Sequence, residues 1–420
     1  MTEFRPSVAR AAEPAAPDRI STIGLAALMR LAYRGDDFAP IWQRLAERAY
    51  RDPTDAAALM DLSTILQLTG QRERGLQLQQ TALRLSPLYR RAYGSGAGPK
   101  LLALVVAGDF MANTPLDFLL DGSDCELHLL YVQPDRPLPA QLPPHEVCFL
   151  AIGESRANRP ILAALAPVLA NWRTPVVNGA PARIAALSRD GVAAMFAADA
   201  DVVVAPTVRC QRQALTAWSK GRAPAPLPPG IGFPLLARPL DSHAGEGLCK
   251  LDDAGCVRAY LHEQTESEFY LAPFIDYRSA DGLFRKQRIA FIGGEAFLSH
   301  MAVSEHWMVH YLSAGMEASA EKRAEEARLF AQFETGFAGR HRAAFASLQR
   351  RIGLDYFAID CAELRDGRLL LFEADVAMIV HSLDPPELFP YKQAAMARLF
   401  GAFQTRLAAA ACRPGLLAAD

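Results

Sequence analysis

The sequence predicts an α/β protein in which an N-terminal α-helical region precedes a small parallel α/β domain and a larger unit of mixed sheets and helices. Three observations predict this class. The first part has the apolar spacing of amphipathic helices, and the middle part alternates buried-strand runs with helical stretches. The last part contains two apolar runs around the dipeptide Asp366-Gly367, which is typical of a β-hairpin.

The helical region is predicted to span residues 21–95. Pro53 and Pro87 lie 34 residues apart, and two amphipathic segments, 55–69 and 72–86, lie between them. This pattern resembles a tetratricopeptide repeat, with a plain helical hairpin as the alternative. Such repeats are docking surfaces, so we expect this region to hold a protein partner or a second copy of the chain. Small residues stand where the paired helices would approach closely: Ala58, Gly75 and Ala82.

A joint rich in glycine and serine at 93–100 leads into the small α/β domain, predicted over residues 98–200. Buried-strand runs begin there at Leu101, Glu126, Val147 and Val176. Polar residues follow several of these strands, where ligands bind in parallel sheets. No Gly-x-Gly-x-x-Gly dinucleotide fingerprint occurs in these loops.

The larger unit is predicted over residues 201–415, with a helix near 209–219 and a strand at 233–239 that carries the cation Arg238. The loop that follows contains Gly245 and Gly247, and flexible backbone beside a cation suits phosphate binding. A simple hairpin turn is the alternative. Further strands are expected at 269–275, 284–292 and 296–302, followed by helices over 315–351 and 388–410. On the second of these strands, Lys286 and Arg288 share one face.

The hairpin at 356–375 brings acidic residues together. If Asp366 and Gly367 are the two loop residues, Arg365 pairs with Arg368, and Asp360 falls opposite Glu373. Asp375, two residues farther along, shares that face. Opposed carboxylates favour a divalent cation, with solvated acids as the alternative. The other face of the hairpin is predicted to be apolar, with Phe357, Ile359, Leu370 and Phe372.

Composition excludes several classes of function. The formal net charge is −2, and neither nucleic acid nor an anionic membrane is expected as a partner. The seven cysteines include no Cys-x-x-Cys pair, which favours reduced thiols and a cytoplasmic protein. No run of 18 apolar residues predicts a membrane span. Residues 1–20 lack an apolar core and are expected to form a disordered leader.

From residue 98 onward, the order of these pieces resembles the ATP-grasp superfamily. Four pieces carry the resemblance: the strand ending at Arg238, the loop 242–247, the stretch 269–276 and the acidic hairpin. The resemblance implies an ATP-grasp fold, with ATP and Mg²⁺ (or Mn²⁺) as cofactors. It also implies metal binding by Asp360, Glu373 and Asp375.

The same resemblance implies further roles. Lys286 and Arg288 would be the catalytic cations that meet the γ-phosphate or the substrate carboxylate, and main-chain groups at Leu271 and Ala272 would bind adenine. The residues implied in ATP binding are Arg238, Ser242, His243, Ala244, Gly245, Gly247, Tyr270, Leu271, Ala272 and Lys286.

Three departures from the family pattern bear on activity. Arg238 stands where the family has a phosphate-binding lysine, which keeps the charge. A second lysine is expected in Arg189-Asp190-Gly191, where none exists. The last metal ligand, commonly asparagine, is Asp375.

A histidine-rich stretch follows the strand that carries Lys286. His300, His306 and Trp307 are predicted to contact the substrate, with plain packing as the alternative. His306 and His310 lie four residues apart and would share a helix face, a spacing that can also bind zinc.

The resemblance implies an ATP-dependent ligase that activates the carboxylate of a small molecule or peptide as an acyl phosphate for attack by an amine. Two alternatives stay open. One is a nucleotide-binding scaffold with weakened catalysis that recruits a partner through residues 21–95, and the other is a kinase of the same fold.

Overall fold

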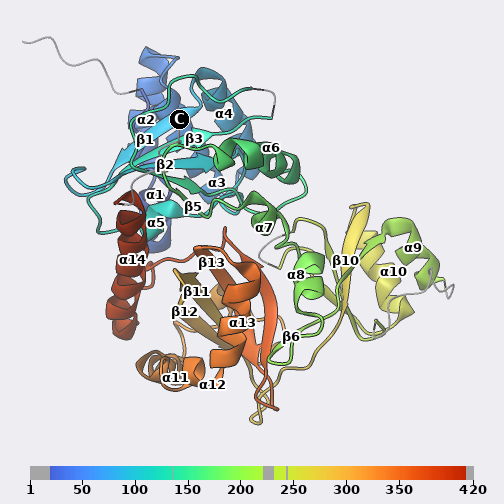
Figure 1. Cartoon of the computed structure of the whole chain (residues 1–420). Helices are drawn as coiled ribbons and strands as arrows, with labels where there is room; N and C mark the ends of the chain where they lie inside the picture. The colour runs from blue at the N-terminus through green and yellow to red at the C-terminus, as the bar shows by residue number, and fades with distance from the viewer. Residues whose placement is uncertain (1–18, 135, 221–230, 243–244, 413–420) are drawn as a thin grey trace, which may run out of the picture.

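The computed structural model describes residues 19–134, 136–220, 231–242 and 245–412 (Figure 1). Three sheets and the helices around them organise this part of the chain. The predicted leader falls almost wholly on residues 1–18, outside the described residues. His243 and Ala244 of the predicted phosphate loop also lie outside them.

The N-terminal helices form where the apolar spacing predicts them. Helices α3 (Ala56–Leu68) and α4 (Arg72–Leu85) correspond to the two segments between Pro53 and Pro87. Gly75 permits their close contact, because a Cβ there would lie 2.8 Å from the main-chain oxygen of Ser63. The tetratricopeptide assignment itself stays a prediction. Two helices precede this pair: α1 (Leu25–Arg34) and α2 (Ala39–Arg51).

The first sheet has the strand order β1-β3-β2-β4-β5, in which β1 runs antiparallel to β3 and the other neighbours are parallel. One face packs on α6 and the other on α5 and α14. Strand β1 belongs to this sheet, although the sequence placed its residues in the helical domain. The elements are β1 (Leu88–Ala92), β2 (Lys100–Val105), α5 (Leu116–Leu119), β3 (Glu126–Tyr131), β4 (Val147–Leu150), α6 (Arg159–Ala170), β5 (Val176–Val177) and α14 (Pro390–Ala411).

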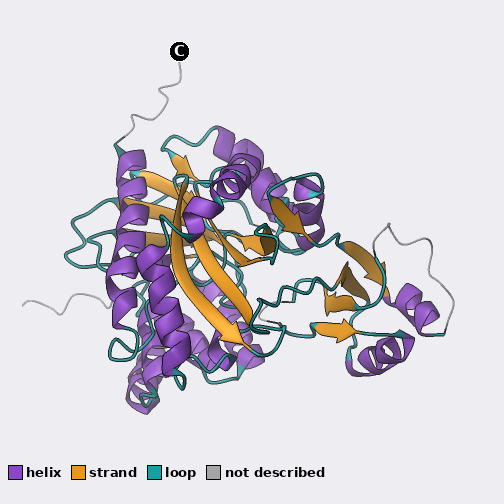
Figure 2. Cartoon of the chain, turned by 90° about the horizontal axis from the view of Figure 1, so that it is seen from below, coloured by secondary structure: helices purple, strands orange, loops and turns teal. Residues whose placement is uncertain are grey.

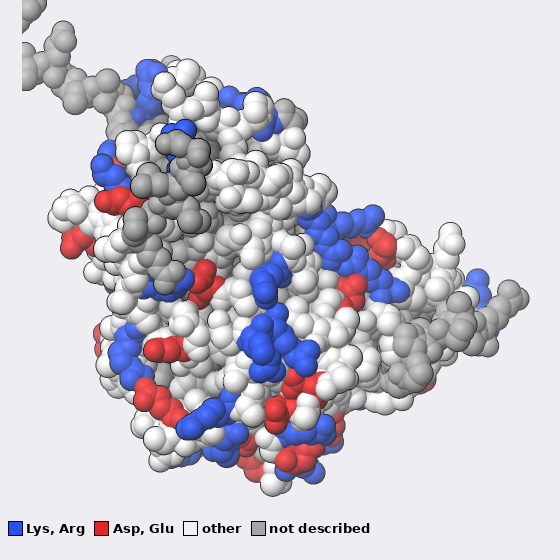
Figure 3. Space-filling view, viewed as in Figure 1, with Lys and Arg blue, Asp and Glu red and all other residues white. Residues whose placement is uncertain are grey.

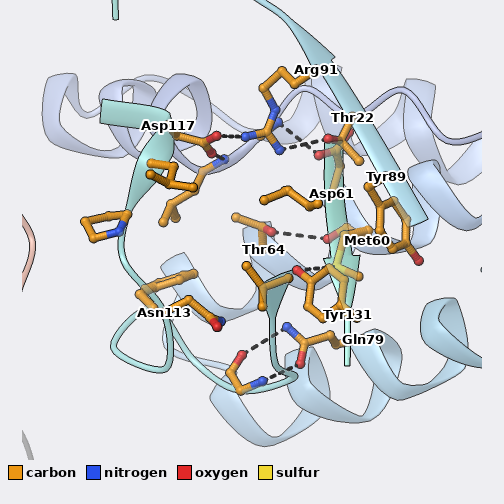
Figure 4. A pocket seen from close by; sticks show the side chains of 18 of the residues that line it. Thr22, Met60, Asp61, Thr64, Gln79, Tyr89, Arg91, Asn113, Asp117 and Tyr131 are labelled. Carbon is orange, nitrogen blue, oxygen red and sulfur yellow. Dashed lines mark hydrogen bonds and ion pairs between the residues drawn. The ribbon is translucent and has the colours of Figure 1, made fainter. Parts of the chain in front are cut away.

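Polar contacts join the helical region to this sheet around a cavity of about 110 Å³ (Figure 4). Asp61 accepts hydrogen bonds from the main-chain nitrogens of Ile23 (2.8 Å) and Gly24 (3.2 Å), just before α1 begins. Asp117 accepts one from the nitrogen of Leu25 at 2.8 Å. These two carboxylates satisfy free amides at the helix start, so α1 is anchored to both α3 and α5.

The second sheet is small and antiparallel, with the order β7-β10-β8-β9. Helices α9 and α10 cover its outer side, and this unit projects from the rest of the molecule (Figure 2). The predicted helix near 209–219 begins only at Arg212, because the preceding residues pair with β10 as a strand. The elements are β7 (Val208–Gln211), α9 (Arg212–Ser219), β8 (Leu235–Pro239), β9 (Cys249–Leu251), α10 (Ala254–Glu263) and β10 (Glu268–Pro273).

The third sheet has the order β12-β11-β13-β14-β6, antiparallel except for the pairing of β6 with β14. The segment 315–351, which was predicted to be helical, forms three helices that cover one face of this sheet. Its elements and helices are α7 (Pro181–Ala185), α8 (Arg189–Phe196), β6 (Val202–Val204), β11 (Phe284–Ile292), β12 (Glu295–Ser304), the 3₁₀ helix η1 (Tyr311–Ser313), α11 (Ala320–Gln332), α12 (Phe337–Arg340), α13 (Arg342–Ile352), β13 (Tyr356–Glu363) and β14 (Leu369–Asp375).

The other face of the third sheet carries a polar band between two apolar clusters. Ala290 and Ala358 pack toward α14 at one end, and Ala302 and Ala362 belong to the cluster at the other. Since side chains alternate along a strand, Asp360, which lies two residues from both Ala358 and Ala362 on β13, points to this face. Arg288 and Lys286, two and four residues before Ala290 on β11, point to it as well. This band holds the candidate site.

The surface shows mixed charge. On the face seen in Figure 3, basic side chains form small groups bordered by acidic ones, with uncharged surface between them. Within the described residues, no helix combines the length and apolar character needed to cross a membrane.

Candidate functional site

The hairpin places Asp360 directly opposite Glu373, as the sequence predicts. The predicted loop is wrong, however. The nitrogen of Leu364 donates to the oxygen of Arg368 at 2.9 Å, so the loop holds three residues instead of two. A register shift beyond Asp360 then adds one residue to β14 and cancels the difference. Two offsets of opposite sense therefore give the predicted pairing.

The register shift also changes which face of the sheet the apolar side chains of β14 occupy. Phe357 and Ile359 pack on the helix-covered face, as predicted. Leu370 and Phe372 instead join the apolar cluster on the acidic face, beside Ala362. The prediction that all four share one face is wrong, because the bulge reverses the alternation within β14.

Asp360 is held by two cations of the neighbouring strand. Lys286 donates through Nζ to Oδ2 at 2.9 Å, and Arg288 donates through Nε to Oδ1 at 2.8 Å and through Nη2 to Oδ2 at 3.0 Å. The Asp360 side chain is only 2% exposed. Burial would raise the pKa of this carboxyl, but the charges of Arg288 and Lys286 outweigh burial and hold it well below its usual value.

Glu373 has a different cation. The guanidinium of Arg189, at the start of α8, binds its Oε2. Burial would raise the pKa of Glu373, and the charge of Asp360 acts in the same direction. The charges of Arg189, Arg238 and Lys286 together outweigh both, and the pKa is lowered. The third acid, Asp375, accepts a hydrogen bond from the nitrogen of Ala377 at 3.0 Å. Burial raises the pKa of Asp375 to about 7, and the charge of Glu373 adds to this.

The arrangement of the three acids does not fit a divalent cation as it stands. Both oxygens of Asp360 are engaged by Lys286 and Arg288, and Arg189 occupies Glu373. In the described part of the chain, no group of three carboxylate, imidazole or thiol side chains is placed to hold a metal ion. Binding of Mg²⁺ or Mn²⁺ stays a prediction.

Arg238 of β8 is a buried cation, 8% exposed. Its Nε donates to Ser242 Oγ at 3.1 Å, and its Nη2 donates to the main-chain oxygen of Ser242. Among the described residues, no carboxylate forms an ion pair with it. Burial, followed by the charge of Arg189, lowers the pKa of Arg238 to about 9. A buried guanidinium that forms no ion pair with a carboxylate is suited to bind an anion.

The glycine loop after β8 needs its last glycine. Gly247 has a φ of +63°, and a Cβ there would lie 2.6 Å from Cδ of Pro239. Gly245, with a φ of +79°, faces Sδ of Met308 in the segment between β12 and η1. The loop therefore lies against both β8 and the end of the β11–β12 hairpin.

A cavity of about 40 Å³ lies between the acidic hairpin and the small sheet. It brings together four of the predicted site residues, Ser242, Tyr270, Glu373 and Asp375. The other residues around it are Glu154, Leu187, Arg189, Asp241 and Ala374.

Leu271 and Ala272 lie inside the strand ladders of β10. Leu271 stands opposite Val208 and Ala237, and Ala272 stands opposite Leu236. Their main-chain groups therefore belong to the sheet, and the predicted adenine contacts at these two positions stay untested.

The histidine-rich stretch does not form one group. His300 lies opposite Arg288, packs on Tyr311 at 4.4 Å, and has its pKa held well below the usual value by burial and by Arg288. His306 is exposed, and Trp307 packs edge-on against Phe274 at 5.6 Å. The helix face predicted for His306 and His310 does not form, because η1 begins only at Tyr311.

Sequence reasoning missed several residues of the site. Arg189 was considered only as a neighbour of the missing lysine, yet its side chain reaches the hairpin. Arg209 pairs with both oxygens of Asp190 at 2.8 and 3.0 Å and lies over the Tyr270 ring at 5.7 Å. Glu154 also lines the cavity. The only signal for it in the sequence is its position after the end of strand β4, where ligands bind in parallel sheets.

A second buried charge network lies beyond His300. Lys392, 2% exposed, binds Glu326 at 3.0 Å and Asp384 at 2.9 Å. Asp384 belongs to the segment 376–389. In the same segment, the main-chain oxygen of Ile379 accepts a hydrogen bond from Nη1 of Arg288 at 3.0 Å. The network fixes this segment between α11, α14 and the site.

A scan against protein families gives no match to this chain, and neither does a search of curated proteins. Solved structures with a similar fold include the RimK domain protein ATP-grasp from Sphaerobacter thermophilus DSM 20745. That likeness has 17% sequence identity and a TM-score of 0.40, and it covers 73% of this chain and 99% of the other. A superposition this loose assigns neither substrate nor reaction, so the function must be inferred from the residues of the site.

Proposed function

We propose that this protein binds ATP through its phosphates, between the small sheet and the acidic hairpin. The observation that carries the proposal is Arg238, a buried guanidinium without a carboxylate partner among the described residues. The neighbouring cations are already paired, Arg189 with Glu373 and both Lys286 and Arg288 with Asp360. Arg238 is therefore the cation of this group that can take up an added anion.

A buried cation that has no ion-pair partner favours binding of an anion. Guanidinium groups bind phosphate oxygens in a fork, and glycine loops allow main-chain amides to approach them. Arg238 and the loop containing Ser242, Gly245 and Gly247 provide both features. The resemblance of the sequence to ATP-grasp proteins agrees with a nucleoside triphosphate.

We further propose that the reaction is that of an ATP-dependent carboxylate–amine ligase. An oxygen of the substrate carboxylate attacks the γ-phosphorus, the bond to the β,γ-bridging oxygen breaks, and ADP leaves. The amine nitrogen then attacks the acyl carbon, the carbon–oxygen bond to phosphate breaks, and the amine loses a proton. Lys286 and Arg288 would neutralise the transferred phosphoryl group or orient the carboxylate, because Asp360 already fixes both side chains.

A nucleotide-binding scaffold is the second candidate. It is favoured by the absence of a lysine at Gly191 and by the cations that already bind the acids, Arg189 on Glu373 and Lys286 on Asp360. Recruitment of a partner through residues 21–95 is part of this candidate. Since α3 and α4 pack on the first sheet and α1 packs on α5, the surface left for it includes α2, where Trp42 is 38% exposed and Tyr50 is 89% exposed.

The test is incubation of the pure protein with ATP, Mg²⁺ and a panel of small carboxylates, peptides and amines. ADP release that requires both a carboxylate and an amine supports the ligase. A stable phosphorylated product supports a kinase of the same fold, and tight ATP binding without turnover supports the scaffold. No ATP binding under any condition overturns the proposal.

A further inference from the structure

The cavity of about 110 Å³ beside the N-terminal helices is separate from the one at the acidic hairpin (Figure 4). It is enclosed by α3, by β1 and β3, and by the loop that follows β2. None of the described residues around it also lines the cavity of about 40 Å³. Strands β2 and β3 run parallel and end here, and ligands of parallel sheets bind at this edge. The cavity is therefore a candidate for a second binding site.

One carboxylate of this cavity, Asp61, forms no ion pair with any residue that the structure describes. The other acids around the cavity are paired, Asp117 with Arg91 and Asp109 with Arg72. Asp61 is 1% exposed and accepts two main-chain hydrogen bonds, although a carboxylate can accept about four. Burial raises the pKa of Asp61, and a cation bound beside it would oppose this effect. An unpaired carboxylate at a buried cavity thus favours a cationic ligand.

The side-chain amides around the cavity leave an acceptor free but no donor. Gln79 bonds the main-chain nitrogen and oxygen of Gly108, both at 2.9 Å. Asn113 bonds the same two groups of Val106, both at 2.8 Å. Both amides are therefore committed to the protein itself. Oε1 of Gln67, on α3, is buried and has no hydrogen-bond partner among the described residues.

Hydroxyl groups and aromatic rings complete the lining. Thr64 donates to the main-chain oxygen of Met60 at 3.2 Å, so its own oxygen remains an acceptor (Figure 4). Tyr131 has the Met60 thioether as its partner, a weak acceptor at 3.9 Å. The rings of Tyr89 and Tyr131 lie edge to face with their centres 5.6 Å apart. Acceptor oxygens together with tyrosine rings suit a ligand that donates hydrogen bonds and carries positive charge.

We propose that this cavity binds a small organic ammonium ion, with Asp61 as its counter-charge. A protonated primary amine has three N–H donors and one positive charge, which match the free acceptors and the unpaired carboxylate. A cavity of about 150 Å³ holds benzene, so this smaller one takes a ligand of about four or five non-hydrogen atoms. The inference does not depend on ATP binding, because the two cavities have no described residue in common.

The test is titration of the full chain with ethanolamine, followed by nuclear magnetic resonance of the main-chain amides of Ile23 and Gly24, which donate to Asp61. Ethylene glycol, of the same size but uncharged, is the matched ligand. Ethanolamine should shift both signals with a dissociation constant of about 1 mM, and ethylene glycol should bind at least about tenfold more weakly. Equal affinity for the two compounds, or a saturable response to neither, overturns the proposal.

Three variants locate the site by the same titration. Asp61→Asn removes the charge but keeps an acceptor for the amides, and it should weaken ethanolamine binding at least about tenfold. Tyr131→Phe keeps Asp61 and the ring, and the loss of one hydroxyl should weaken binding about threefold. Asp121→Asn is the control, since Asp121 pairs with Arg30 and does not line the cavity, and its affinity should be unchanged.

A thermal melt shows which variants are folded. Wild-type affinity in folded Asp61→Asn overturns the assignment of Asp61. If Asp61→Asn does not fold, wild-type affinity in Tyr131→Phe overturns the site.

Discussion

Arg288 and Asp360 face each other across the β11–β13 ladder, and the guanidinium binds both carboxylate oxygens, at 2.8 and 3.0 Å. Both side chains are largely buried, at 18% and 2% exposure. Such a pair is costly to break from one side, because the remaining charge keeps its burial and loses its partner.

Asp360→Asn is expected to destabilise the protein by about 3–5 kcal/mol, since it leaves Lys286 and Arg288 without their counter-charge. Asp281→Asn is the control, because Asp281 pairs with Arg285 of the same strand but is 49% exposed. The control should change stability by about 1 kcal/mol or less. Urea unfolding measures both, and equal losses would contradict the structural role given to Asp360.

Arg238→Met is expected to stabilise the ligand-free protein by about 1–2 kcal/mol, because it replaces a buried cation that has no carboxylate partner with an apolar side chain of similar length. Arg258→Met serves as a control, since Arg258 is exposed on α10 of the same unit. Chemical denaturation without ligand gives the comparison. A clear loss of stability in Arg238→Met would show that the cation is already satisfied.

The free energy of unfolding should decrease as the pH is lowered, because of His381. Burial lowers the pKa of His381 to about 4, Lys392 and Arg288 add to this, and Asp384 opposes it. The unfolded chain, with an ordinary value near ~6.5, takes up the proton first. The contribution is therefore complete above about pH 6.5 and is lost as the pH falls toward 4.

Comparing urea unfolding at pH 7.5 and pH 5 tests this directly. His381→Gln should reduce the difference between the two pH values by about 1 kcal/mol. The exposed His262 of α10 provides the control substitution, His262→Gln, which should leave the difference unchanged. The hydroxyl of Tyr33 lies 3.4 Å from Nε2 of His381, a contact that we assign to a neutral imidazole ring. An unaltered pH dependence in His381→Gln would be evidence against that neutral ring.

The three-residue hairpin loop requires glycine at Gly367, which has a φ of +84° and open space around it. Gly367→Ala should cost about 1 kcal/mol through backbone strain alone. Gly401→Ala, in the middle of α14 with no atoms near its Cβ position, should instead stabilise by about 0.5–1 kcal/mol. The same sign for both changes in thermal unfolding would argue against the loop geometry.

The elements with a clear period were predictable from the sequence. The pairing of Asp360 with Glu373 was right, although the loop and the bulge that produce it were not foreseen. Turn composition sets which residues bend the chain, but it does not reveal a compensating bulge three residues into the next strand. Leu370 and Phe372 were misplaced for that reason.

The long-range contacts of the site could not be predicted in this way. Arg189 reaches Glu373 across 184 residues of sequence, and nothing in the local pattern of either residue names the other. Lys392 likewise sits on an amphipathic helix, where a lysine is ordinarily solvated, and is instead bound by two buried acids. Burial of charge depends on tertiary packing, which period and composition do not determine.

The most direct test of ATP binding at Arg238 is calorimetric titration of ATP into the wild type, Arg238→Met and Arg258→Met. We predict binding to the wild type, unchanged affinity in Arg258→Met, and affinity at least about tenfold weaker in Arg238→Met, because a charge-assisted contact with phosphate is lost. Equal affinity in all three proteins, or no binding to the wild type, would contradict ATP binding there.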